Sequence, residues 1–138
     1  MTSTRGDPAA LQRGNIVLIA DRGGEFTGKP RPAVVVQSAF FNTATVTVCL
    51  ITSVAVDAPL MRIALPADAT TGLEVASWAA VDQLATVRCS RVRGPIGHLA
   101  GATLREIDQA ILQFLGFADH WAKGLGVIAM PTESPGSP

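Results

Sequence analysis

The chain has 138 residues and a mass of 14.3 kDa, a size that fits one domain with a modest core. Its 11 Lys and Arg residues balance 11 Asp and Glu residues, which argues against a protein that coats nucleic acid or membrane through bulk positive charge. Charged residues make up only 16% and hydrophobic residues 48%. We therefore expect part of the apolar surface to be covered by a second copy or by another protein.

The chain carries no pattern typical of a membrane protein, a secreted protein or a metal site. Polar residues interrupt the richest apolar run, 46–56, so it falls short of the roughly 18 residues of a membrane span. Residues 1–12 lack the apolar core of a signal peptide and predict a flexible leader, which favours a cytoplasmic protein. Cys49 and Cys89 stand far apart without a CxxC pair, so we expect two small buried side chains and no metal or cofactor.

Short β-branched runs separated by turn residues predict a protein made mainly of strands. These runs lie at 15–20, 33–37, 45–52, 59–65, 75–85 and 86–92. After the first run, residues 21–32 contain three glycines and two prolines, which predicts a turn-rich loop.

One helix is predicted near the end of the chain. The sequence T-L-R-E from Thr103 to Glu106 is typical of a capping box, and apolar residues follow it at helical spacing. Gly116 is well placed to end this helix. Residues 118–138 are rich in Gly, Pro and Ser and predict a partly disordered tail, which leaves 13–117 as the folded domain.

This order of elements predicts a fold that is mainly β with a C-terminal helix, either a strongly curved antiparallel sheet or a barrel. The βαβ alternation of Rossmann and TIM-barrel enzymes is absent. The GxGxxG, GxxxxGK[ST], GxSxG and HExxH motifs are absent as well, which argues against the chemistries that they support.

Several segments occur together in a characteristic order. They are R-G-N-I-V at 13–17, K-P-R-P-A-V-V-V-Q at 29–37, T-V-T-V-C-L-I-T-S at 45–53 and G-L-E-V-A-S-W-A-A-V-D-Q-L-A-T-V at 72–87. In combination they resemble the MazF/PemK family of bacterial toxins over about residues 13–116. The resemblance implies an SH3-like barrel, a homodimer, metal-free cleavage of single-stranded RNA and silencing by a cognate antitoxin protein. Asn15 departs from the Asp that the family has in its R-G-D segment.

The resemblance matches Arg31 and Thr52 to the catalytic Arg and Thr of the family. When a 2′-hydroxyl attacks its own phosphate, charge builds on the non-bridging oxygens and a fixed cation stabilises it. A guanidinium can bind those oxygens through two N–H groups, and a Thr hydroxyl can donate one more hydrogen bond. From the residues alone, a solvated loop arginine and a β-branched strand residue remain alternatives.

Further residues are candidates for binding the RNA. Gln83 matches an RNA-contacting Gln of the family, Lys29 and Ser53 lie beside the two catalytic candidates, and Phe26 could stack on an unpaired base. Gln37 is a polar candidate at a strand end, where a glutamine is also a common backbone hydrogen-bond partner. The others could instead be solvated residues, and Phe26 could belong to a dimer or antitoxin surface.

His98 invites a role as a general base, but its distance in sequence from both catalytic candidates favours a structural role. Arg88, Arg91 and Arg93 form the one basic run, which fits an RNA path or a solvated strand end.

With this resemblance, we expect a cytoplasmic, dimeric endoribonuclease toxin. The alternative is a non-catalytic barrel of the same fold that inhibits DNA gyrase, or one that only binds RNA or protein.

Overall fold

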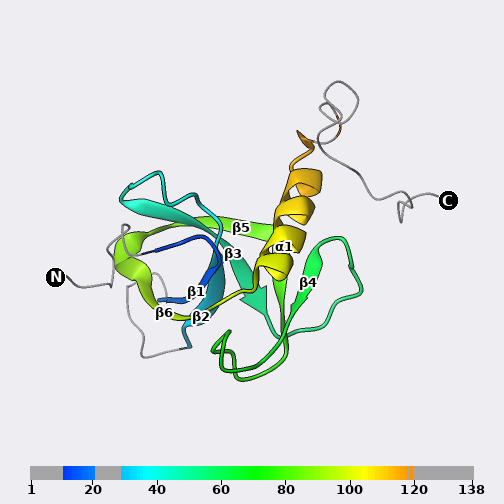
Figure 1. Ribbon diagram of the computed structural model, residues 1–138, viewed down its shortest axis with the longest axis horizontal. Helices are drawn as coiled ribbons and strands as arrows, with labels where there is room; N and C mark the ends of the chain where they lie inside the picture. The colour runs from blue at the N-terminus through cyan, green and yellow to red at the C-terminus, as the bar shows by residue number, and fades with distance from the viewer. Residues whose placement is uncertain (1–10, 21–28, 118, 120–138) are drawn as a thin grey trace.

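The protein is described by a computed structural model that covers residues 11–20, 29–117 and 119. Its elements are β1 (Asn15–Ile19), β2 (Arg31–Val35), β3 (Thr45–Thr52), β4 (Arg62–Leu65), β5 (Ser77–Arg88), the 3-10 turn η2 (Cys89–Arg91), β6 (Val92–His98) and α1 (Gly101–Phe114). The strands form one antiparallel sheet in the order β4-β5-β3-β2-β1-β6. Figure 1 shows this sheet curling around at β1, β2 and β6, with α1 between the curl and β4.

The predicted fold class, mainly β with a C-terminal helix, is confirmed. The edge strands β4 and β6 do not pair with each other in the described part of the chain, so the sheet is strongly curved and open. The word barrel therefore applies to the curl of the sheet and not to a closed ring of strands.

The side chains of β3 alternate between two separate cores. Val46 and Val48 belong to a core enclosed by β1, β2, β3, β5 and the start of β6. Cys49 and Ile51 belong to a second core beneath α1, which also contains the fully buried Ile107. Successive residues of a strand point to opposite faces, so β3 is buried on both sides, which explains its continuous apolar run.

The strand prediction is confirmed to the residue for β3 and to within a few residues for β1, β2 and β4. The predicted break between strands at 75–85 and 86–92 is wrong, because β5 continues to Arg88 and the chain then turns through η2. The segment 92–98 forms β6 instead, although no strand was predicted beyond residue 92.

The composition of β6 explains why it was missed. It contains Pro95 and two glycines, which favour turns, and a proline is tolerated here because β6 lies at an edge of the sheet. Gly97 allows a close approach, since a Cβ at this position would lie 2.1 Å from the carbonyl oxygen of Thr71. The neighbouring His98 amide donates a hydrogen bond of 2.8 Å to the Thr70 carbonyl. A nearby loop therefore packs directly on this part of β6.

The predicted capping box is wrong, because α1 begins at Gly101 with Ala100 as its N-cap and no side chain caps it. Leu99 is buried, and its amide donates a hydrogen bond of 3.0 Å to the carbonyl of Gly14. This anchor fixes the chain just before Ala100, so the helix starts directly after β6. The predicted end is confirmed, since Gly116 follows the helix with a positive φ of 82°.

The lower boundary of the folded domain also differs from the prediction. Leu11 was assigned to the leader, yet it is buried in the core enclosed by the curl. Residues 1–10 and most of the predicted tail lie outside the described residues. None of the helices in the described part is long and apolar enough to span a membrane.

Candidate active site

Arg31 and Thr52 lie at the same end of two neighbouring strands, as the first residue of β2 and the last residue of β3. The antiparallel register pairs Ala33 with Leu50, and when it is continued by two residues Arg31 stands opposite Thr52. Residues directly opposite each other in antiparallel strands point to the same face, with Cβ atoms about 4.5–5.5 Å apart. The two residues predicted as catalytic are therefore neighbours in space.

The hydroxyl of Thr52 is oriented by the turn that follows β3. The backbone N–H of Val54 donates a hydrogen bond of 3.1 Å to its Oγ1. Within the described residues this oxygen accepts that bond while its own O–H has no acceptor. The hydroxyl can therefore donate to an added ligand, and Ser53, which is exposed, lies next to it.

The side chain of Arg31 is exposed and makes no ion pair or hydrogen bond with any residue that the structure describes. Pro30 and Pro32 flank it, and each fixes its own φ, which restricts the backbone on both sides. Lys29, also exposed, lies two residues earlier. This end of β2 therefore presents two cations, one of them with a planar fork suited to a phosphate.

Gln83 lies in a bulge of β5 close to Thr52. The register pairs Cys49 with Leu84 and Ile51 with Ala79, so Leu50 alone faces the four residues 80–83. Gln83 is exposed, and Leu50 is two residues from Thr52 along β3, which corresponds to roughly 7 Å. Gln83 thus lies on the strand next to Thr52, and β3 separates it from Arg31.

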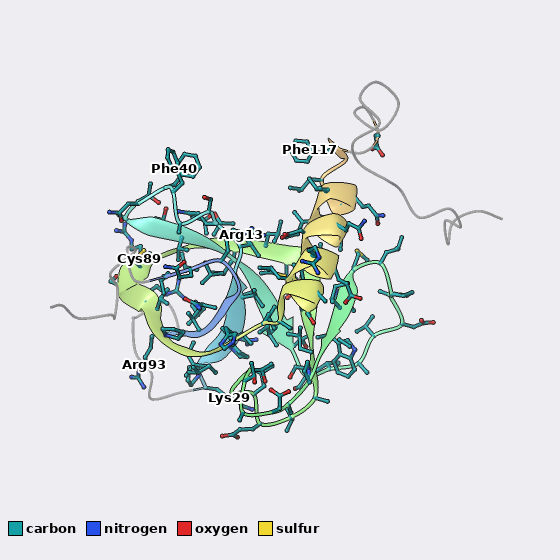
Figure 2. All side chains as sticks on the ribbon, in the orientation of Figure 1. Arg13, Lys29, Phe40, Cys89, Arg93 and Phe117 are labelled. Atoms are coloured by element: carbon teal, nitrogen blue, oxygen red, sulfur yellow. The ribbon has the colours of Figure 1, made fainter. Side chains whose placement is uncertain are left out.

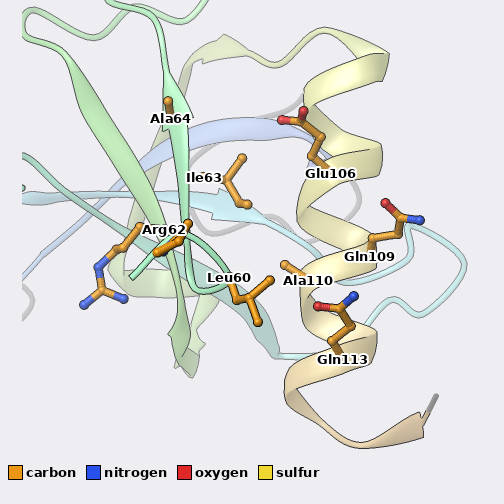
Figure 3. Close-up of a pocket in the computed structure, with 9 residues that line it drawn as sticks. Leu60, Arg62, Ile63, Ala64, Glu106, Gln109, Ala110 and Gln113 are labelled. Atoms are coloured by element: carbon orange, nitrogen blue, oxygen red, sulfur yellow. The ribbon is translucent and has the colours of Figure 1, made fainter. Parts of the chain in front are cut away.

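An ion pair between Arg62 of β4 and Asp82 supports this bulge. The Arg62 side chain is only 11% exposed, and Figure 3 shows its guanidinium pointing away from α1. Asp82 directly precedes Gln83, so the ion pair helps to fix the backbone that carries the glutamine.

Gln37 does not join this group. Its amide donates hydrogen bonds of 3.0 Å to the Phe41 carbonyl and 3.2 Å to Thr43 Oγ1, and its Oε1 accepts one of 3.0 Å from the Thr47 amide. Gln37 lies beyond the far end of β2 from Arg31 and closes the loop between β2 and β3. Gln37 therefore binds the backbone of a neighbouring loop, which is the alternative role considered for it from the sequence. Phe26, the remaining candidate, lies outside the described residues.

His98 is remote from the catalytic candidates. It pairs with Asn15 at the start of β1, whereas Arg31 pairs with Ile19 at its end. Four residues of strand separate these positions, which is roughly 13 Å. This separation agrees with the structural role expected from the sequence.

The basic run does not form one continuous stripe. Arg91 donates through Nε and Nη2 to the Ala20 carbonyl, at 3.1 and 2.5 Å, and so ties the end of β1 to η2. Arg88 ends β5 and Arg93 lies in β6, and both are exposed. Arg91 therefore has a structural role, and it separates Arg88 from Arg93 along this turn of the chain.

Both cysteines are buried, as predicted. Burial and the nearby Asp82 carboxylate raise the pKa of the Cys49 thiol to about 12, against a smaller opposing effect of Arg62. A thiol with such a pKa does not serve as a nucleophile at neutral pH. Among the described residues, no three His, Cys, Asp or Glu side chains lie close enough together to hold a metal ion.

Two surface depressions in the described part of the chain lie elsewhere. One, of about 270 Å³, lies between β4 and α1 and is shown in Figure 3, where Ile63 and Gln109 contribute to its walls. The other, of about 420 Å³, lies between α1 and the sheet, with Leu84 and Leu115 in its lining. Neither is lined by Arg31, Thr52 or Gln83, and the candidate site lies at the exposed ends of two central strands of the sheet.

One residue beside the candidate site was not predicted from the sequence. Trp78 of β5 is the register partner of Thr52, on the side away from Arg31. Its aromatic character was visible in the sequence, but its pairing depends on the bulge at 80–83, which no sequence motif marks.

Known proteins are similar to this chain in sequence and in fold. A probable endoribonuclease MazF from Mycolicibacterium smegmatis is 40% identical over 109 residues, which cover 78% of this chain and 99% of the relative. The crystal structure of MazE-MazF from Deinococcus radiodurans (Form-II) matches with a TM-score of 0.62 and 25% identity, over 77% of this chain and 95% of the other. The Mycobacterium tuberculosis toxin MazF-mt6 shares the fold, with a TM-score of 0.61 and 20% identity over 73% of this chain and 95% of the toxin.

The family model of PemK-like, MazF-like toxins of type II toxin–antitoxin systems matches residues 12–115, which span the whole described sheet and α1. Together with the 40% identical relative, this match shows that the chain belongs to the PemK-like, MazF-like toxin family.

Proposed function

We propose that this chain is the toxin of a toxin–antitoxin pair and cleaves single-stranded RNA at the site formed by Arg31 and Thr52. The name of its 40% identical relative, a probable endoribonuclease MazF, supports the activity. The register between β2 and β3 supports the assignment of residues: continued by two residues, it sets Arg31 opposite Thr52, and neither the guanidinium nor the hydroxyl hydrogen is bound by any described residue.

The proposed reaction needs no metal. The 2′-hydroxyl loses its proton to the solvent and attacks the adjacent phosphorus, so that the P–O2′ bond forms. The P–O5′ bond then breaks, and O5′ takes up a proton. The products are a 2′,3′-cyclic phosphate and a 5′-hydroxyl. Arg31 binds the non-bridging oxygens as their charge grows, and the Thr52 hydroxyl donates a further hydrogen bond to them.

Neighbouring residues bind the RNA in this proposal. Lys29 contacts a phosphate next to the scissile one, and the Ser53 hydroxyl adds a polar contact beside Thr52. Gln83 reads a base edge with its amide, from a backbone position that the Arg62–Asp82 ion pair supports. The balanced charge of the chain fits a short recognition site with few phosphate contacts.

A cleavage assay tests this proposal directly. Purified protein is incubated with mixed-sequence RNA and excess EDTA, and the product ends are mapped. We expect cutting in EDTA with cyclic phosphate and 5′-hydroxyl ends, and losses of about 100-fold or more in the Arg31→Ala and Thr52→Ala variants. Arg105→Ala and Thr103→Ala on α1 are matched controls that should cut normally. Intact RNA would favour the non-catalytic alternative, and cutting that survives Arg31→Ala would remove that residue from the mechanism.

We also propose a cytoplasmic homodimer that an antitoxin protein silences. A solved structure of an endoribonuclease in complex with its cognate antitoxin, from Mycobacterial species, has the same fold at 18% identity. The surface supports protein partners, because Phe40 is 84% exposed and Phe41, Val54 and Leu115 are each more than half exposed. Light scattering at micromolar concentration should give twice the chain mass, and a monomer at that concentration would contradict the dimer.

A further inference from the structure

A row of paired residues crosses four strands at the candidate active site. Thr52 of β3 pairs with Trp78 of β5, and Trp78 pairs in turn with Ala64 of the edge strand β4. On the other side of Thr52, the continued register leads to Arg31 of β2. Because directly paired residues share a face, this row places the guanidinium, the hydroxyl and the indole on one side of the sheet.

The row lies on the face of the sheet away from α1. The residues next to it along β3, β5 and β4 are Ile51, Ala79 and Ile63, and all three pack in the core beneath the helix. Successive side chains of a strand point to opposite faces, so Thr52 and Trp78 point the other way. Figure 3 agrees with this assignment, since Arg62, two residues from Ala64 on β4, also points away from α1.

The side chain of Trp78 is accessible to solvent beside the edge strand β4. It is half-buried, and Ala64, its neighbour on β4, is small and exposed, with no further strand beyond it in the described sheet. Adjacent strands are about 5 Å apart, so the backbone of Trp78 lies roughly 5 Å from that of Thr52 and 10 Å from that of Arg31 across the sheet. A nucleotide whose phosphate contacts Arg31 and Thr52 can extend its base, or the base next to it, over the indole.

We propose that Trp78 is a stacking platform for an RNA base that flanks the scissile phosphate. The inference rests on the proposed ribonuclease function and adds a binding residue to it. An indole face stacks on any unpaired base and so provides affinity with little sequence readout. Selection between bases is then left to hydrogen-bonding groups such as the Gln83 amide. Removing one such stacking contact typically weakens binding by roughly 5- to 150-fold.

Tryptophan fluorescence gives a direct test. The chain has two tryptophans, so the Trp121→Phe variant reports on Trp78 alone. The probe is an oligoribonucleotide spanning the mapped cut site, with a 2′-deoxy nucleotide on the 5′ side of the cut to prevent cleavage. We expect saturable quenching of Trp78 on binding. We also expect a Kd that rises roughly 5- to 150-fold in Trp78→Leu and less than threefold in Trp78→Phe. Trp78→Leu keeps an apolar strand residue, so urea unfolding should report an intact fold.

A second series of probes identifies the stacked base. Each carries one abasic nucleotide, and at one position the loss of affinity should be large for the native protein and absent for Trp78→Leu. Phe114→Ala is the matched control, because Phe114 is an exposed aromatic residue that ends α1, and Figure 2 shows this end of the helix, beside Phe117, far from Lys29. It should leave the Kd unchanged.

The outcomes separate this inference from the function on which it rests. If the probe binds by fluorescence anisotropy but neither quenches Trp78 nor loses affinity in Trp78→Leu, the stacking platform is refuted while the ribonuclease stands. If the native protein neither binds nor cuts RNA, both are refuted.

Discussion

The ion pair between Arg13 and Asp108 allows a quantitative prediction about how α1 is held. Arg13 Nη2 lies 2.5 and 2.6 Å from the two Asp108 oxygens, and its Nη1 donates to the Val36 carbonyl at 2.5 Å. One side chain thus joins the segment before β1 to the helix and to the end of β2. The two side chains are 34% and 38% exposed, so solvent screens the ion pair to about 1 kcal/mol despite its two-point geometry.

We predict that Asp108→Asn lowers the free energy of unfolding by about 1 kcal/mol and Arg13→Gln by about 2 kcal/mol. The arginine variant costs more because it also removes a charge-assisted hydrogen bond to the Val36 carbonyl, which adds about 1 kcal/mol. Urea unfolding of both variants and of the double variant forms a double-mutant cycle with an expected coupling of about 1 kcal/mol. Each kcal/mol should lower Tm by roughly 3–5 °C for a chain of this length.

Salt and a control variant sharpen this measurement. The coupling should fall by more than half in 1 M NaCl, where the Debye length is about 3 Å. Arg105→Gln, an exposed arginine of α1, should cost less than about 0.5 kcal/mol. Equal costs for the two single variants, or a coupling near zero at low salt, would refute the argument.

Three more predictions concern packing and protonation. Ile107→Ala leaves a cavity at a fully buried site beneath α1 and should lower the free energy of unfolding in urea by about 2–5 kcal/mol. Ile107→Val should lower it by about 1 kcal/mol. Gly97→Ala forces a Cβ to 2.1 Å from the Thr71 carbonyl, so Tm should fall by more than about 10 °C, and an unchanged Tm would contradict the close approach. The pKa of Cys49, raised from 9.0 to about 12, means that the unfolded thiol ionises first, so stability should decline as pH rises from 9 towards 12. Cys49→Ala should show a shallower decline over the same range.

The sequence predicted elements best where one physical signal dominated. The β-branched run of β3 is buried on both faces, and its bounds were predicted to the residue. β6 could not be predicted, because Pro95 and Gly97 favour turns locally and are accommodated only by an edge position and a loop packed close by. The start of α1 was misplaced for a similar reason, since a tertiary contact at Leu99 decides it and not a capping side chain.

In the candidate site too, local sequence segments pointed to some residues, whereas the roles of others depend on contacts with residues distant in sequence. Arg31 and Thr52 stand out because their segments resemble those of a known family, and Gln37 stood out only as a polar residue at a strand end. No local pattern indicates that the Gln37 amide closes a loop, since its partners are separated from it by several residues. Trp78 went unnoticed because its position beside Thr52 follows from the register shift in β5.

The bulge in β5 shapes the candidate site at this end of the sheet. Four residues of β5 stand opposite Leu50, so the strand changes register there and serves both β3 and the short strand β4. A regular ladder through the same residues would pair Thr52 with residue 81 instead of Trp78 and would remove the bulge that carries Gln83. The partly buried Arg62–Asp82 ion pair lies at this bend, where its geometry supports the shifted register. Substitutions at Arg62 should therefore affect RNA binding through Gln83 and Trp78 together, although Arg62 itself need not touch the RNA.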